Sequence, residues 1–323
     1  MNKLLNQARV LITGASGLIG INLIRYIREI APACQIIAFV HSLEKAKRVL
    51  PEAEWLTLVE GDVNQPIKID GKIDYIIHGA SITSSKMFVD APVETIFTSV
   101  YGTRNMLELA REKQVRSFLY LSSTEIYGAP QTDEKITEDA FCCIDAMQKR
   151  SSYPESKRLC ETMCGAYYAE YGVPAKVLRM TQTIGPGIDY SDGRVFAEFA
   201  RCVIEKKNII LRTKGETKRC YLSTRDAASA ILTVLLKGQN GQAYNAANEA
   251  TYCSIYEMAE TVAQECANGE IAVEIQMDDA ARYGYMPVLR MNLDTRKLRA
   301  LGWVAKDRLV DMYRTLIDSL KNP

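Results

Sequence analysis

Residues 14–20 read Gly14-Ala15-Ser16-Gly17-Leu18-Ile19-Gly20, and this stretch decides the fold. It lies between the apolar run Val10-Leu11-Ile12, which is typical of a buried parallel strand, and a segment from Leu18 to Ile30 with apolar residues at helical spacing. The three glycines permit a tight turn, let the backbone approach a pyrophosphate and let the helix pack on the strand. The helix N-terminus then offers free N–H groups to phosphate. The sequence therefore predicts a dinucleotide-binding turn, although a glycine-rich turn can also serve packing alone.

A tyrosine and a lysine stand four residues apart in the run Tyr153-Pro154-Glu155-Ser156-Lys157. On a helix, both side chains project from one face. A phenol ordinarily has a pKa of about 10, and a nearby ammonium together with a nicotinamide cation favours the phenolate. We therefore expect Lys157 to lower the pKa of Tyr153, so that Tyr153 transfers protons near neutral pH. The same spacing also occurs on ordinary helix surfaces.

The segment from Leu119 to Gly128 begins as an apolar strand and ends in polar residues. Ligands of open α/β sheets bind at the carboxyl ends of the strands, so this segment points to the same crevice as the glycine turn. We expect Ser123 to orient Tyr153 and Glu125 to carry a second proton transfer. The alternative for Glu125 is a carboxylate at a strand end that faces water.

Strand and helix patterns alternate up to about residue 180, which predicts βαβ units and a parallel sheet. Strands are expected over residues 10–13, 35–40, 55–60, 75–78, 117–121 and 175–180, with long helices over 92–113 and 154–171. Beyond residues 185–187 the pattern is mixed, with helices over 195–207 and 224–237 and a strand near 220–223. We predict an α/β fold with a Rossmann-type doubly wound parallel sheet in residues 1–182. Residues 183–323 are expected to form mainly a smaller C-terminal substrate-binding lobe, with segments that return to the first domain.

The composition is that of an ordinary globular protein. The 323 residues are 47% hydrophobic and 24% charged, and 40 basic and 39 acidic residues leave a net charge of +1, which gives no sign of nucleic-acid binding. No apolar run approaches the roughly 20 residues that span a bilayer, and residues 1–9 are too short and polar for a signal peptide, so we expect no membrane association and a cytoplasmic location. Nine cysteines without a C-x-x-C pair and only two histidines predict neither a disulfide framework nor a metal site.

Taken together, these motifs resemble the extended short-chain dehydrogenase/reductase family, which contains nucleotide-sugar epimerases, dehydratases and decarboxylases. The resemblance runs from about residue 8 to about residue 305 and rests on an ordered series: Thr13 with residues 14–20, residues 78–81, residues 102–105, Ser123, Tyr153, Lys157, Arg179, residues 185–186, Arg219, Asp226 and residues 301–303. It implies a redox-neutral enzyme that works through a transient 4-keto sugar.

The resemblance and the strand ends together indicate a cofactor site. The residues expected in it are Gly14, Ser16, Gly17, Leu18, Ile19, Gly20, His41, Asp62, Val63, Ala80, Tyr153 and Lys157. The resemblance implies NAD. The second strand, however, ends in His41 and lacks the acidic residue that NAD-selective folds carry about 20 positions after the glycines. Lys45 and Arg48 follow and can accept the 2′-phosphate of NADP or lie on a solvated helix face, so NAD and NADP both stay open.

Residues 123–128 resemble the signature of UDP-glucuronate decarboxylases and related dehydratases, whereas 4-epimerases usually lack the glutamate. Thr124 stands where 4,6-dehydratases usually carry an aspartic acid, which puts dehydration in doubt. Gln182 and Ser99 replace two asparagines that are common in the family, the first of which holds the pyrophosphate of the sugar nucleotide.

Three arginines are candidates for the substrate. The resemblance implies that Arg219 and Arg290 grip the pyrophosphate and ribose of a sugar nucleotide, a task that suits guanidinium forks. Arg150, just before the tyrosine motif, can meet a substrate carboxylate. Each of the three can instead be a surface arginine.

The leading interpretation is an NAD(P)-dependent nucleotide-sugar decarboxylase or dehydratase that keeps its cofactor bound. The alternatives are a nucleotide-sugar 4-epimerase, a keto-sugar reductase and a dinucleotide sensor without catalysis. The resemblance also implies a homodimer, in which the helices over residues 92–113 and 154–171 of two subunits form a four-helix interface.

Overall fold

The computed structural model describes residues 2–141, 143–277 and 288–322. Its largest unit is a parallel sheet of seven strands in the order β10-β6-β5-β4-β1-β2-β3. These strands are β1 (Arg9–Thr13), β2 (Gln35–Val40), β3 (Leu56–Glu60), β4 (Tyr75–His78), β5 (Ser117–Ser123), β6 (Ala175–Met180) and β10 (Ala243–Ala246). Each strand expected in the N-terminal half is present, with bounds within two residues of the prediction, and the α/β fold is confirmed.

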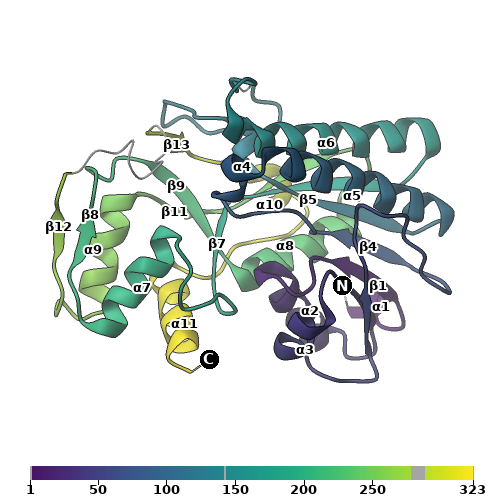
Figure 1. Ribbon diagram of the computed structural model, residues 1–323, viewed down its shortest axis with the longest axis horizontal. Coiled ribbons are helices and arrows are strands. Elements are labelled where there is room, and N and C mark those ends of the chain that lie inside the picture. The colour runs from purple at the N-terminus through teal and green to yellow at the C-terminus, as the bar shows by residue number, and fades with distance from the viewer. Residues whose placement is uncertain (1, 142, 278–287, 323) are drawn as a thin grey trace.

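Helices cover both faces of this sheet (Figure 1). The long helices α5 (Pro92–Glu112) and α6 (Ser152–Tyr171) lie on one face, while α2 (Leu18–Ile30) and α8 (Thr224–Lys237) lie on the other. Shorter helices join the strands or flank the sheet: α1 (Asn2–Leu5), α3 (Leu43–Val49), α4 (Met87–Asp90), α10 (Arg296–Arg299) and the 3₁₀ turns η1 (Thr124–Tyr127) and η2 (Lys149–Ser151).

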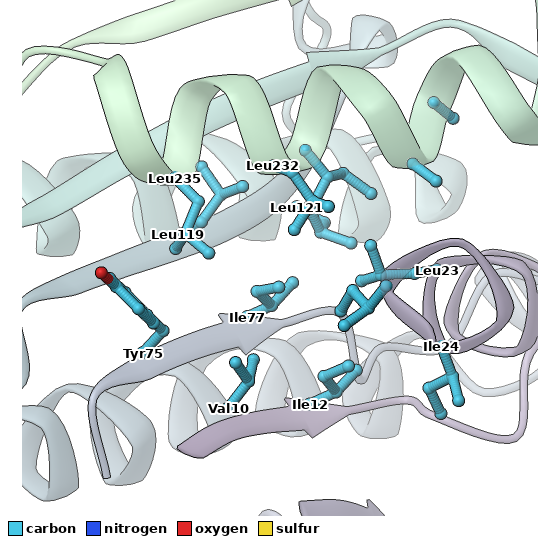
Figure 2. Packing of buried hydrophobic residues seen from close by; sticks show 14 of the residues in the cluster. Val10, Ile12, Leu23, Ile24, Tyr75, Ile77, Leu119, Leu121, Leu232 and Leu235 are labelled. Carbon is cyan, nitrogen blue, oxygen red and sulfur yellow. The ribbon is translucent and has the colours of Figure 1, made fainter. Parts of the chain in front are cut away.

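The alternation of side chains along β1 explains why the sheet has a hydrophobic core on each face. Val10 and Ile12 belong to the hydrophobic core beneath α2 and α8, whereas Leu11 belongs to the core beneath α5 and α6. Successive strand residues point to opposite faces, so a continuous apolar run can serve both cores. Figure 2 shows Leu232 and Leu235 of α8 facing Val10 and Ile12 across the strands of the first core.

A smaller C-terminal lobe stands beside the carboxyl edge of the large sheet (Figure 1). It holds a mixed sheet of β7 (Gln182–Ile184), β9 (Lys218–Ser223), β11 (Asn248–Ser254) and β13 (Arg290–Met291), and a pair made of β8 (Ile209–Leu211) and β12 (Val273–Ile275). Helices α7 (Val195–Glu205), α9 (Ile255–Glu265) and α11 (Leu309–Lys321) share its core.

Two elements of the C-terminal half belong to the large sheet. Strand β10 pairs in parallel with β6, and α8 packs on the same face as α2. A division of the chain near residue 182, with returning segments, stays our proposal. Among the described residues, no helix combines the length and the apolar character that crossing a membrane requires.

Candidate active site

The glycine turn is built by close packing. Gly14 has φ of +70°, and a Cβ there would lie 2.8 Å from the carbonyl carbon of Gly79. A Cβ on Gly20 would lie 2.4 Å from the Gly14 carbonyl oxygen, so the third glycine lets α2 approach the turn. The N-cap of α2 is Gly17, and no side chain caps the helix. The first N–H groups of α2 are therefore available to an anion, and the turn fits the pyrophosphate of a dinucleotide.

A buried histidine joins the two strand ends beside this turn. Thr13 Oγ1 accepts hydrogen bonds from the N–H groups of Gly79 and Ala80, each at 3.1 Å. Its own proton then goes to His78 Nδ1 at 2.7 Å, which leaves the ring hydrogen on Nε2. Burial lowers the pKa of His78 to about 3, so the ring stays neutral. This contact holds β1 and β4 together where the cofactor site begins.

A cavity of about 1530 Å³ runs from the glycine turn to the C-terminal lobe. It is lined by most of the predicted site residues: Gly14, Ser16, Gly17, Leu18, Ile19, His41, Asp62, Val63, Ala80, Ser123, Thr124, Glu125, Arg150, Tyr153, Gln182 and Arg219. The structure thus brings residues from β1, β2, β3, β4, β5 and the second lobe to one place.

Three predicted residues do not line this cavity. Gly20 packs beneath the turn, and Lys157 is buried behind Tyr153. The Nη1 of Arg290 donates to Asp133 Oδ2 at 2.9 Å, and Arg290 is not among the residues that line the cavity. Arg219, by contrast, lines the cavity, and its buried Nε has no hydrogen-bond partner among the described residues.

The ring of Tyr153 is fixed by Phe88 of α4. The two rings stack with centroids 4.2 Å apart and an angle of 10° between their planes. Burial raises the pKa of Tyr153 and the charge of Glu125 raises it further, whereas a hydrogen bond with Ser123 and the charge of Arg150 lower it. Ser123 therefore lies near enough to Tyr153 to lower its pKa, and its orienting role stays a prediction.

Lys157 is not among the groups that shift the pKa of Tyr153, and burial of the phenol is the largest cause of its raised pKa. The Nζ of Lys157 donates to the Leu121 carbonyl at 2.9 Å and lies 5.7 Å from the centroid of the Tyr153 ring. Burial lowers the pKa of Lys157 to about 8, against Cys160, Glu161 and Cys164, which raise it. The lowering of the Tyr153 pKa by Lys157 together with a nicotinamide cation stays a prediction.

Glu125 and Arg150 form a two-pronged ion pair at the edge of the cavity. Arg150 Nη1 donates to Glu125 Oε2 at 2.7 Å, and Nη2 donates to Oε1 at 3.2 Å. The guanidinium also lies 5.5 Å from the centroid of the Phe88 ring. A second cavity of about 340 Å³ is lined by both members of the pair and by Arg219. The sequence had suggested each residue separately but not their pairing.

Sequence reasoning missed Phe88 and Glu161. Glu161 on α6 accepts from Ser122 Oγ at 2.5 Å and from Arg179 Nη2 at 2.7 Å, and so joins the helix to the ends of β5 and β6. The position of Glu161 two turns after Tyr153, on a helix that must face the sheet, was the available signal. For Phe88, no signal in the sequence indicated the stacking.

Within the described ranges, no group of three or more His, Cys, Asp or Glu side chains could hold a metal ion.

Comparison with known proteins agrees with this geometry. The profile of the NAD dependent epimerase/dehydratase family matches residues 10–247. The chain is 30% identical over 310 residues to UDP-glucuronic acid decarboxylase 5 of Arabidopsis thaliana, with 94% of this chain and 86% of that one covered. It is 28% identical over 303 residues to UDP-glucuronic acid decarboxylase 1 of Xenopus tropicalis, with 92% and 68% covered.

Solved structures share the fold. A UDP-glucose 4-epimerase of Thermotoga maritima with UDP-glucose superposes with a TM-score of 0.81 at 20% identity, covering 97% of this chain and 98% of that one. A dTDP-glucose 4,6-dehydratase of Bacillus anthracis in complex with NAD gives 0.78 at 20% identity, covering 97% and 96%. The expected resemblance is confirmed: with the glycine turn, the tyrosine and the profile match in agreement, the chain belongs to the NAD dependent epimerase/dehydratase family.

Proposed function

We propose that the protein is a nucleotide-sugar decarboxylase, which removes the carboxylate of a nucleotide-linked uronic acid through a 4-keto sugar. The observation that carries the proposal is the Glu125–Arg150 pair in the same cavity as Tyr153 and the glycine turn. A carboxylate that a guanidinium fork holds at the edge of the cavity suits a second proton transfer. The likeness to UDP-glucuronic acid decarboxylases supports the same choice.

The first step would be oxidation at C4 of the sugar. Bound oxidised nicotinamide would accept hydride, and its positive charge would favour the phenolate of Tyr153. Tyr153 accepts the proton of the C4 hydroxyl as the C4–H bond breaks. Ser123, which already bonds to Tyr153, holds the oxygen in line.

The second step would be loss of carbon dioxide. A ketone at C4 makes the uronate a β-keto acid, so the C5–C6 bond can break with its electron pair delocalised into the C4 carbonyl. Glu125 then delivers a proton, taken up from solvent, to C5, while Arg150 fixes the position of Glu125. Tyr153 returns its proton to the C4 oxygen as hydride returns to C4. The net reaction consumes one proton and releases carbon dioxide, and the cofactor ends oxidised.

The test is incubation of the purified protein with UDP-glucuronate and related nucleotide uronates, followed by mass spectrometry. We expect a product lighter by carbon dioxide, steady absorbance of the nicotinamide, and no turnover in Tyr153→Phe. Unchanged turnover in Tyr153→Phe would contradict the proposed chemistry. Stoichiometric consumption of reduced cofactor would establish a keto-sugar reductase, and binding without any turnover would establish a sensor.

A 4-epimerase is the second candidate, because Arg150 already holds both oxygens of Glu125. If Glu125 stays bound to Arg150 and delivers no proton to C5, the keto sugar can rotate in the site and be reduced on its other face. A product of unchanged mass with inverted C4 would establish this reaction, and loss of water would establish a dehydratase.

A further inference from the structure

The carboxyl end of β2 lacks the acidic side chain that recognises NAD. After Val40 the chain continues with His41, an exposed residue that lines the large cavity. In sheets of this kind, a carboxylate at this place accepts hydrogen bonds from the adenosine ribose of NAD, whereas a basic side chain accommodates the 2′-phosphate of NADP. The residue at the decisive position is therefore not an acceptor for two ribose hydroxyls.

Three carboxylates near His41 each have a partner on at least one oxygen. Glu60 Oε1 accepts from the N–H of Leu43 at 2.9 Å, at the start of α3. Glu44 is paired with Arg48 on the same helix. Asp62 lines the cavity after β3, but its Oδ1 accepts from the N–H of Asn64 at 2.9 Å. Asp62 lies at the end of β3, and the place at the end of β2 that recognises the ribose is held by His41.

One ammonium faces the same part of the cavity. Lys45 lines it, whereas Lys47 and Arg48 of the same helix do not. Ser42 Oγ accepts from the Lys45 N–H at 3.3 Å and so caps the N-terminus of α3, which places Lys45 one helical turn after His41. In the part of the chain that the structure describes, the Lys45 side chain has no hydrogen bond or ion pair, unlike Arg48. Its charge is therefore uncompensated beside the cavity.

We propose that the adenosine end of this site takes the 2′-phosphate of NADP, with Lys45 and His41 as its contacts, and that the protein prefers NADP to NAD. The preference departs from the name of the family to which the chain belongs. The inference rests on the dinucleotide site of the proposed function and not on which sugar is converted.

The test is calorimetric titration of the full chain, freed of bound nucleotide, with NADP⁺ and with NAD⁺ at low salt. We expect NADP⁺ to bind about tenfold more tightly or better, which corresponds to about 1.4 kcal/mol. Lys45→Gln is expected to weaken NADP⁺ by about tenfold and NAD⁺ by less than about twofold, because only the phosphate meets the ammonium. Lys47→Gln removes the same charge from the same helix outside the cavity, and should change neither affinity. His41→Asp should reverse the preference.

Tighter binding of NAD⁺ to the wild type, or an equal loss for both dinucleotides in Lys45→Gln, would overturn the inference. Because the titration measures binding without turnover, a protein that binds NADP⁺ preferentially but converts no uronate would refute only the proposed function. Decarboxylation by a protein that retains NAD⁺ and rejects NADP⁺ would refute only the cofactor preference.

Discussion

The ring of Tyr153 is held by packing on one side and meets the cavity on the other. Phe88 supplies the packing surface, and its backbone carbonyl accepts from Ser152 Oγ at 3.0 Å, one residue before the tyrosine. The phenol therefore keeps its direction even though burial raises its pKa. Phe88 sets the position of the Tyr153 ring, whereas burial, Glu125, Ser123 and Arg150 set its pKa. Substitutions can therefore change the position and the pKa of the phenol separately.

Replacing Phe88 by leucine should lower kcat by about two- to tenfold, since a stacked aromatic pair is worth about 0.5–1.5 kcal/mol beyond its buried area. KM should change by less than about twofold, because Phe88 does not line the cavity. Steady-state kinetics and a pH–rate profile measure both. Val89→Ala, an exposed neighbour on α4, is the control and should leave both constants unchanged. A loss confined to KM would contradict a positioning role.

His78 should make the folded protein sensitive to acid. Its pKa is lowered to about 3 by burial, below the value of about 6.5 for an unfolded histidine. Between these two values the unfolded chain binds the extra proton, so the free energy of unfolding falls as the pH drops from 6.5 toward 3. NMR of the ring in a His41→Gln variant, where one histidine signal remains, should show a neutral ring with the hydrogen on Nε2 at pH 5. A ring that is protonated at pH 5 in the folded protein would refute this.

At the scale of elements, α6 carries Tyr153 and Lys157, and a buried ion pair holds it to the sheet. Glu161 and Arg179 are paired at 2.7 Å with about a tenth of each side chain exposed, and Ser122 at the end of β5 bonds to the same carboxylate. A pair this buried is costly to break on one side, because the remaining charge stays desolvated. The catalytic helix is thus tied to the strand ends that carry Ser123.

Glu161→Gln should lower the free energy of unfolding by about 3–5 kcal/mol, since it leaves Arg179 without a charged partner. Chemical denaturation of the full chain measures the change. Glu155→Gln is the matched control on the same helix: its pair with Arg158 is 3.4 Å long and well exposed, so less than about 1 kcal/mol should be lost. Equal losses in the two variants would show that Glu161 does not fasten the helix.

The sequence predicted those elements whose evidence is local. Apolar periodicity located the strands and the long helices, and glycine spacing located the turn between β1 and α2. It did not predict the stacking of Phe88 on Tyr153 or the pairing of Glu125 with Arg150, because each joins segments that only the fold brings together. The direction of the Lys157 side chain and the burial that raises the pKa of Tyr153 could not be predicted for the same reason, because both depend on neighbours distant in the sequence.

At the scale of the molecule, α5 and α6 present apolar side chains to solvent on the side away from the sheet. They are Val93, Ile96, Phe97 and Tyr101 on α5 and Leu159, Tyr168 and Tyr171 on α6. The two helices pack against each other (Figure 1). Exposed apolar surface of this kind marks a site of association. We propose that it is the surface on which two copies form the homodimer.

The double variant Phe97→Glu and Tyr101→Glu should dissociate the dimer, because the substitutions place two carboxylates within the apolar surface. Sedimentation at micromolar concentration should show a dimer for the wild type and a monomer for the variant. Val304→Glu, at an exposed apolar residue outside α5 and α6, is the control and should remain dimeric. A wild type that sediments only as a monomer would exclude the proposed interface.

Strand β10 has a consequence for how the protein is made. It pairs with the edge of β6 from a point more than sixty residues later in the chain, after β7, α7, β8, β9 and α8. Until β10 has been synthesised, the edge of β6 away from β5 therefore has unpaired backbone groups. Such an edge can pair with strands of other molecules. A fragment that stops near residue 182 should aggregate for that reason. In the longer chain, β10 covers this edge of β6.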